Sequence, residues 1–203
     1  MIEECLLICI LLVLGTIYHY KPELLGLERL EVLTIVSQLE SVSGRFEYIV
    51  SNDGVTAIID YAHTPDALKN VLETINDIRT GNENVLTVIG CGGDRDKMKR
   101  PKMAHISTQL STQVIFTTDN PRTENPETIL EEMELGVLPE NERKTLTVLN
   151  RKQAIKTACK LSKTGDIILI AGKGHENYQE INGVRTHFDD IEEVQNCFNQ
   201  LKK

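Results

Sequence analysis

The 203-residue sequence lacks the patterns of several common protein classes. Its five cysteines form no Cys-x-x-Cys pair and have no histidine cluster near them, which argues against a zinc or other metal site and against a disulfide framework. No basic stripe is present and the formal net charge is -8, so a nucleic-acid partner is not expected. Neither Gly-x-Gly-x-x-Gly nor the Walker pattern occurs. The default expectation is a protein of the reducing cytoplasm.

One long hydrophobic run is present, near the amino terminus. Residues 5–15 are almost uninterrupted in apolar character, but Glu3 and Glu4 precede them where a secretory signal needs basic residues. A bilayer span needs about 20 apolar residues, so no membrane span is expected. The run predicts a buried helix or a displaced piece of one, and the spacing of leucine and valine over residues 22–39 predicts a second helix.

From residue 44 onward, strand and helix patterns alternate. Uninterrupted apolar strands are predicted over residues 55–61, 85–89, 114–118, 145–149 and 166–171, and helices over 65–78, after Pro101, over 126–135, over 151–161 and from Asp190. Asn182-Gly183 between two short β runs predicts a hairpin. The expected fold class is α/β: a Rossmann-like, mostly parallel sheet with helices on both faces and a carboxy-terminal β-hairpin.

Four polar loops follow the predicted strands. Their sequences are Asp60-Tyr61-Ala62-His63, Gly92-Gly93-Asp94-Arg95-Asp96-Lys97, Asp119-Asn120-Pro121-Arg122 and Gly172-Lys173-Gly174-His175-Glu176. Parallel strands end at one edge of a sheet, which is where open α/β folds bind ligands. Arg95 and Arg122 can hold carboxylates, and Glu176 with backbone carbonyls can accept hydrogen bonds from an ammonium group. The loops together favour a site for a zwitterionic amino acid.

Each motif also has a simpler interpretation. Arg122 can be a turn residue paired with Glu124 or Asp119, and the glycine loops can be strand-to-helix turns that need positive φ. An isolated loop histidine such as His63 is more often a surface residue than a catalyst. Asp60 can orient that histidine or receive a nucleotide hydroxyl.

In their order along the chain, these motifs and Gly44-Arg45-Phe46-Glu47 resemble the carboxy-terminal domain of the Mur ligases of peptidoglycan synthesis. Asp-Asn-Pro-Arg is similar to the signature of the branch that adds meso-diaminopimelate to UDP-N-acetylmuramoyl-L-alanyl-D-glutamate. The resemblance implies roles in cell-wall biogenesis, cell shape and cell division. It divides the chain into residues 1–43, a helical remnant of the preceding central domain or an aberrant leader, and residues 44–203, the domain itself.

The resemblance also implies roles for individual residues. Those expected to hold diaminopimelate are Arg95, Asp119, Asn120, Pro121, Arg122, Gly172 and Glu176. Arg122 would bind the distal carboxylate, and Glu176 with the Gly172 backbone would bind the distal ammonium. Arg45, Asp60, Tyr61 and His63 would face the nucleotide when the domains close.

The family reaction uses ATP and Mg²⁺ to convert the D-glutamate carboxylate into an acyl phosphate, which the diaminopimelate amine then attacks. The sequence has no Gly-Thr-Asn-Gly-Lys-Thr phosphate loop, so we expect a truncated or frame-shifted chain that is inactive alone and binds neither cofactor tightly. ATP and the UDP-linked dipeptide would bind only with the missing domains. A stand-alone domain that binds diaminopimelate or a cell-wall precursor without catalysis remains an alternative. A nicotinamide-dependent oxidoreductase is a weaker one, opposed by the missing Gly-x-Gly-x-x-Gly.

Overall fold

The computed structural model describes residues 44–201, and the helices expected over residues 5–15 and 22–39 lie outside this part. The main sheet contains β1 (Glu47–Val50), β2 (Thr56–Asp60), β3 (Val85–Ile89), β4 (Gln113–Phe116), β5 (Thr145–Thr147) and β6 (Ile167–Ala171). The helices are α3 (Pro65–Ile78), α4 (Lys99–Leu110), α5 (Pro126–Glu134), α6 (Arg151–Leu161) and α7 (Asp190–Leu201), with a short 3-10 helix η2 (Pro139–Lys144). A separate hairpin consists of β7 (Tyr178–Ile181) and β8 (Val184–His187).

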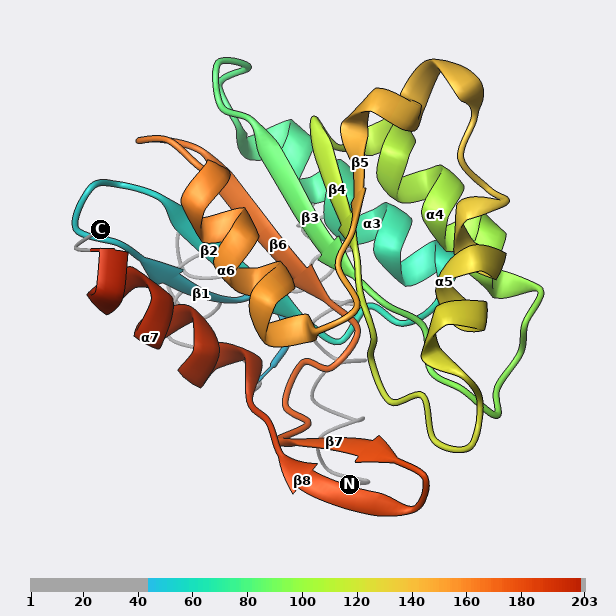
Figure 1. Ribbon diagram of the computed structural model, residues 1–203. Helices are drawn as coiled ribbons and strands as arrows, with labels where there is room; N and C mark the ends of the chain where they lie inside the picture. Colours follow the sequence, from blue (N-terminus) through green and yellow to red (C-terminus); the bar gives the residue numbers. More distant parts are fainter. Residues whose placement is uncertain (1–43, 202–203) are drawn as a thin grey trace, which may run out of the picture. The chain divides into compact units, whose positions relative to one another are not determined.

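The strand order is β1-β2-β6-β3-β4-β5, and only β1 runs antiparallel to its neighbour. The predicted mostly parallel sheet and carboxy-terminal hairpin are therefore confirmed (Figure 1). Asn182 and Gly183 both have positive φ, 50° and 77°, as the turn of a two-residue hairpin requires. The edge strand β1 was not predicted, because its four residues alternate between half-buried and exposed positions and carry no continuous apolar signal.

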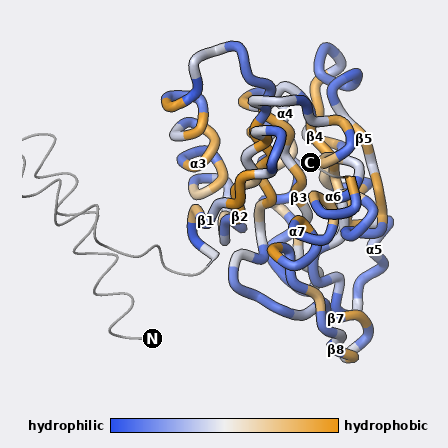
Figure 2. The backbone as a smooth tube through the Cα atoms, turned by 90° about the vertical axis from the view of Figure 1, so that its left-hand side faces the viewer, coloured by the Kyte–Doolittle hydropathy of each residue, from blue (hydrophilic) through white to orange (hydrophobic). Residues whose placement is uncertain are grey.

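Helices cover both faces of the sheet and enclose two apolar clusters. On one face Leu72 of α3, Met103 of α4 and Met133 of α5 are fully buried. On the other face Ile155 of α6 and Phe198 of α7 pack with the opposite sides of the strands. Figure 2 shows the apolar character concentrated in β2, β3 and β4, between the two helix layers. Burying each such side chain contributes about 1.5–3 kcal/mol, so the two clusters fix the sheet as a rigid platform.

Helices α3, α5 and α6 each begin after a residue whose side chain accepts a hydrogen bond from the first turn. The Thr64 hydroxyl accepts a hydrogen bond from the Ala67 amide at 3.3 Å, with Pro65 in the first helical turn. The prediction that α4 follows Pro101 is wrong by two residues, because the helix begins at Lys99. A proline is tolerated there, since the amides of the first turn have no partner within the helix.

The strand register places the four polar loops side by side. Asp60 pairs with Ala171, Ala171 with Ile89, and Ile89 with Phe116, so these residues form one row across the sheet. Each of the four predicted loops leaves its strand at or just beyond this row. The expectation that they share one rim is confirmed.

Candidate functional site

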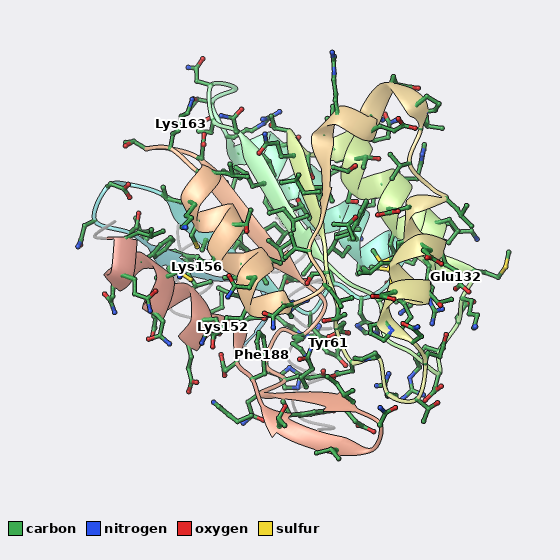
Figure 3. The ribbon with its side chains drawn as sticks, viewed as in Figure 1. Tyr61, Glu132, Lys152, Lys156, Lys163 and Phe188 are labelled. Carbon is green, nitrogen blue, oxygen red and sulfur yellow. The ribbon has the colours of Figure 1, made fainter. Side chains whose placement is uncertain are left out.

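The four loops and the β7–β8 hairpin surround a cavity of about 860 Å³ at this rim. Eight of the eleven predicted site residues line it: Tyr61, His63, Arg95, Asp119, Asn120, Arg122, Gly172 and Glu176. In Figure 3, Tyr61 lies between the strand ends and the hairpin. The cavity lining does not include Arg45, Asp60 or Pro121. Its size fits an amino acid with room to spare.

Arg122 is held by its backbone and leaves most of its guanidinium available. Its φ of 50° is unusual for a residue with a side chain. Two hydrogen bonds to the hairpin maintain it, from the Arg122 amide to the Glu180 carbonyl at 3.0 Å and from the Asn182 amide to the Arg122 carbonyl at 2.6 Å. The guanidinium Nη1 donates to the Gly93 carbonyl at 2.8 Å. Within residues 44–201 Arg122 makes no ion pair, so its remaining donors can bind a ligand carboxylate.

The carboxylate that could have neutralised Arg122 is engaged elsewhere. Glu124 accepts two hydrogen bonds from the buried Arg100, at 2.9 and 3.0 Å, and Lys97 lies 3.1 Å away. The hydrogen bond from Arg100 lowers the pKa of Glu124 to about 2. The interpretation of Arg122 as a turn residue paired with Glu124 or Asp119 is therefore wrong.

Sequence reasoning missed Lys173, which is fully buried at the centre of the rim. Its Nζ atom donates to Asn120 Oδ1 at 3.0 Å and to the Tyr178 carbonyl at 2.6 Å. Asp119 Oδ1 is an ion-pair partner at 3.2 Å, although this oxygen accepts no well-directed hydrogen bond within the described residues. The available signal was a lysine between two glycines directly after a continuous apolar strand.

Asn120 connects this lysine to Glu176. The Asn120 Oδ1 atom accepts from Lys173 and from the Glu180 amide, and its Nδ2 donates to Glu176 Oε2 at 2.8 Å. Glu176 Oε1 accepts no hydrogen bond within residues 44–201, and the side chain is partly exposed. A carboxylate oxygen at the cavity wall is thus available to an ammonium group.

Two glycines of the second loop differ in how closely they are packed, and only Gly93 lies against backbone. An added Cβ at Gly93 would lie 1.9 Å from the Pro121 carbonyl oxygen, and one at Gly92 would lie 2.9 Å from Arg122 Nη1. Neither residue has positive φ, so the interpretation that these glycines serve a turn needing positive φ is wrong; the left-handed residue of this loop is Asp94, with φ 54°. The interpretation is correct for Gly172, whose φ is 115°.

Of the four residues expected to face a nucleotide, two line the cavity and two do not. Asp60 Oδ2 accepts from the Phe46 amide at 2.8 Å, and burial raises the pKa of this carboxyl group. Asp60 does not orient His63, whose Nδ1 lies 2.9 Å from the Tyr61 carbonyl and whose ring centroid is 4.6 Å from that of Tyr61. Arg45 is exposed and outside the cavity.

Other charged side chains complete the rim. Lys99 Nζ donates to the His63 carbonyl at 2.8 Å, and Lys102 also lines the cavity. Arg185 of the hairpin lies 4.5 Å from the Tyr178 ring and 3.0 Å from Glu180. Among residues 44–201 no group of three or more His, Cys, Asp or Glu side chains is placed to hold a metal ion. The helices of this part include none with the length and hydrophobicity to cross a membrane.

The fold is an α/β domain with a cavity lined by charged and polar side chains at the carboxyl edge of its sheet. Residues 44–174 match the family described as Mur ligase, glutamate ligase domain. The match covers more than half of the chain, and the chain belongs to this family.

Similar proteins carry one name in common. The chain is 58% identical over 167 residues to the UDP-N-acetylmuramoyl-L-alanyl-D-glutamate–2,6-diaminopimelate ligase of Cytophaga hutchinsonii, covering 82% of this chain and 34% of that protein. The ligase of the same name from Bacteroides thetaiotaomicron is 54% identical over 176 residues, covering 87% and 36%. A solved structure of a ligase with this name superposes with a TM-score of 0.74 at 40% identity, over 89% of this chain and 36% of that one. This chain therefore spans about a third of the length of the relatives it matches.

A more distant structure supports the fold alone. The UDP-N-acetylmuramate-alanine ligase of Thermotoga maritima superposes with a TM-score of 0.55 at 18% identity, over 89% of this chain and 35% of that one. The shared feature is the mostly parallel sheet with its covering helices.

Proposed function

We propose that this chain is the amino-acid-binding domain of a ligase that adds meso-diaminopimelate to UDP-N-acetylmuramoyl-L-alanyl-D-glutamate in peptidoglycan synthesis. The observation that carries the proposal is the pairing of opposite charges in one cavity. Within residues 44–201, Arg122 presents guanidinium donors and Glu176 a carboxylate oxygen that have no hydrogen-bond partner. A ligand centre that bears both a carboxylate and an ammonium group complements this pair.

The proposal assigns a role to each of the site residues. Arg122 binds the distal carboxylate of diaminopimelate, and Arg95, exposed at the opposite loop, adds a second cation. Glu176 and the Gly172 carbonyl receive the distal ammonium. Asp119, Asn120 and Pro121 hold the loop that carries Arg122. Charge matching and positioning of this kind are the main sources of rate in amide ligation.

ATP and Mg²⁺ belong to the proposed reaction of the complete enzyme, where they would activate the D-glutamyl carboxylate. Tyr61 and His63 line the cavity and are the residues of this domain proposed to contact the nucleotide, together with Arg45 after domain closure. Lys99 supplies a nearby positive charge that suits a phosphate-bearing group. We expect the isolated chain to bind neither ATP nor the UDP-linked dipeptide tightly. A cytoplasmic setting is part of the proposal, supported by the buried cysteines Cys91 and Cys197, which are in the thiol form within the described residues.

The test is a calorimetric titration of the purified chain with meso-diaminopimelate, with L-lysine as the matched ligand. L-Lysine has the same spacing between its two amino groups but lacks the distal carboxylate, so we expect its affinity to be lower by about ten- to a hundredfold, the value of one charge-assisted contact. Equal affinities for the two ligands would remove the proposed role of the cavity.

Turnover of ATP, followed in the same samples, separates this proposal from the alternative of a stand-alone binding domain. We expect no turnover by the chain alone. Addition of a protein that carries the phosphate loop and the UDP-binding portion of a related ligase should restore ligation. Persistent binding without restored ligation would favour the stand-alone binding domain.

A further inference from the structure

Lys173 is the most deeply buried charge at the rim, and neither the motif signature nor the proposed ligand contacts give it a task. Its ammonium group is shielded completely from solvent and contacts three parts of the site. These are the Asp119-Asn120 loop, the Tyr178 carbonyl at the start of the hairpin and, at 3.8 Å, the Glu176 carboxylate. Burying an ammonium group costs free energy unless the group is fully hydrogen-bonded or paired. The hydrogen bonds and ion pairs around Lys173 must therefore offset this cost.

The hydrogen bonds around Asn120 permit only one orientation of its amide. Lys173 Nζ and the Glu180 amide are both donors, so the atom that faces them must be the Asn120 oxygen. The amide nitrogen is thereby directed to Glu176 Oε2 at 2.8 Å. A reversed amide would place a donor against two donors and an oxygen against a carboxylate. Lys173 and the Glu180 amide therefore together select which end of Asn120 meets Glu176.

We propose that Lys173 is a positioning residue that orients Asn120 and, through Asn120, presents Glu176 Oε1 to the ammonium group of the ligand. The inference rests on the proposed function for the identity of the ligand, but the orientation of Asn120 exists without any ligand. Lys173 itself does not line the cavity. Its effect on affinity passes through Asn120 and Glu176.

The first experiment uses the unliganded full chain. The side-chain NH₂ resonances of Asn120, assigned by their loss in Asn120→Ala, are followed by NMR in the parent chain and in Lys173→Met. We expect protons of this group to exchange with water about tenfold faster in Lys173→Met, the factor that corresponds to one lost hydrogen bond. Lys152→Met, an exposed lysine on α6, is the matched control and should leave the rate unchanged. An unchanged rate in folded Lys173→Met would overturn the positioning role.

The second experiment is a double-mutant cycle on meso-diaminopimelate affinity. Lys173→Met and Asn120→Ala should each weaken binding by about tenfold or more, and the double variant should bind no more weakly than the weaker single variant. Additive losses would show that Lys173 acts independently of Asn120 and would overturn the inference. If the parent chain does not bind diaminopimelate, the proposed function fails, and the exchange rates alone decide the positioning role. If Lys173→Met does not fold, Lys173→Gln, whose amide can still donate to the Tyr178 carbonyl, takes its place in both experiments.

Discussion

Arg151 and Arg122 both lie near the carboxyl ends of the strands, but their side chains are used in opposite ways. Arg151 is fully buried and bonds both oxygens of the buried Asp190, at 2.8 and 2.7 Å, and the carbonyl of Ala171. Arg122 is half-buried and bonds only backbone carbonyls within the described residues. The comparison teaches that the presence of an arginine at a binding edge is uninformative until its carboxylate partner, or the lack of one, is known.

The largest expected effect is the loss of stability when the buried ion pair between Arg151 and Asp190 is broken. Arg151→Met leaves Asp190 buried without a partner, so the free energy of unfolding should fall by about 3–5 kcal/mol, measured by urea denaturation. The diaminopimelate affinity of the folded fraction should not change. Lys152→Met is the control on the same helix, because its ion pair with Glu193 involves an exposed lysine and is worth about 0–1 kcal/mol. A loss as small as that of the control would contradict a structural role for Arg151.

A change at Arg122 should have the opposite effect, a large loss of ligand affinity with a small loss of stability. Arg122→Met should weaken diaminopimelate binding by about ten- to a hundredfold, which corresponds to roughly 1.5–3 kcal/mol for a charge-assisted contact. The free energy of unfolding should fall by only about 1 kcal/mol, because one hydrogen bond to the Gly93 carbonyl is lost. Calorimetric titration and urea denaturation measure the two quantities. Arg143→Met, at an exposed position on η2, should change neither.

Two neighbouring glycines sharpen the comparison between stability and binding. Gly93→Ala brings its Cβ against the backbone of Pro121 and should lower the free energy of unfolding by about 1–3 kcal/mol. Gly92→Ala meets only the end of the Arg122 side chain, which can move. It should weaken diaminopimelate binding with less loss of stability. Equal stability losses in the two variants would show that the second loop tolerates backbone movement.

The smallest effect is a pH dependence from the Glu124–Arg100 pair. Glu124 has its pKa lowered from 4.5 to about 2, chiefly by the hydrogen bond from Arg100. Its contribution to stability is therefore complete above pH 4.5 and is lost as the pH falls toward about 2. Glu124→Gln should flatten the decline of unfolding free energy across this window, measured by denaturation at each pH. Glu131→Gln, at an exposed position on α5, is the control. It should show the same dependence of unfolding free energy on pH as the parent chain.

The sequence predicted the fold well where burial is two-sided. All five residues of β3 and all five of β6 are buried, and such strands appear in the sequence as continuous apolar runs. Strand β1 lacks this signal because it lies at the edge of the sheet, with Tyr48 and Val50 exposed. Adjacent glutamates on a helix are typical of a solvated face, and Glu131 of α5 is exposed. Glu132 instead bonds the buried Arg100, a contact between segments distant in sequence.

The sequence predicted which loops form the site, but not which of their side chains bond to one another. Parallel strands with polar residues at their ends place Asn120, Arg122 and Glu176 at one rim, and the structure brings them together. The partners of each charge depend on distances of a few ångströms between loops, which no spacing in the sequence encodes. For that reason Lys173 was overlooked, and of the two alternatives for Asp60 the one in which it orients His63 is wrong.

The left-handed backbone at Arg122 has a consequence for protein engineering. The amide and carbonyl of this residue are both hydrogen-bonded to the hairpin, at Glu180 and Asn182. The hairpin therefore stabilises the conformation of the loop. Transferring Asp119-Asn120-Pro121-Arg122 into another sheet of this type would transfer the sequence but not the backbone conformation at Arg122. A graft that keeps the arginine aimed at the cavity must also include residues 178–187.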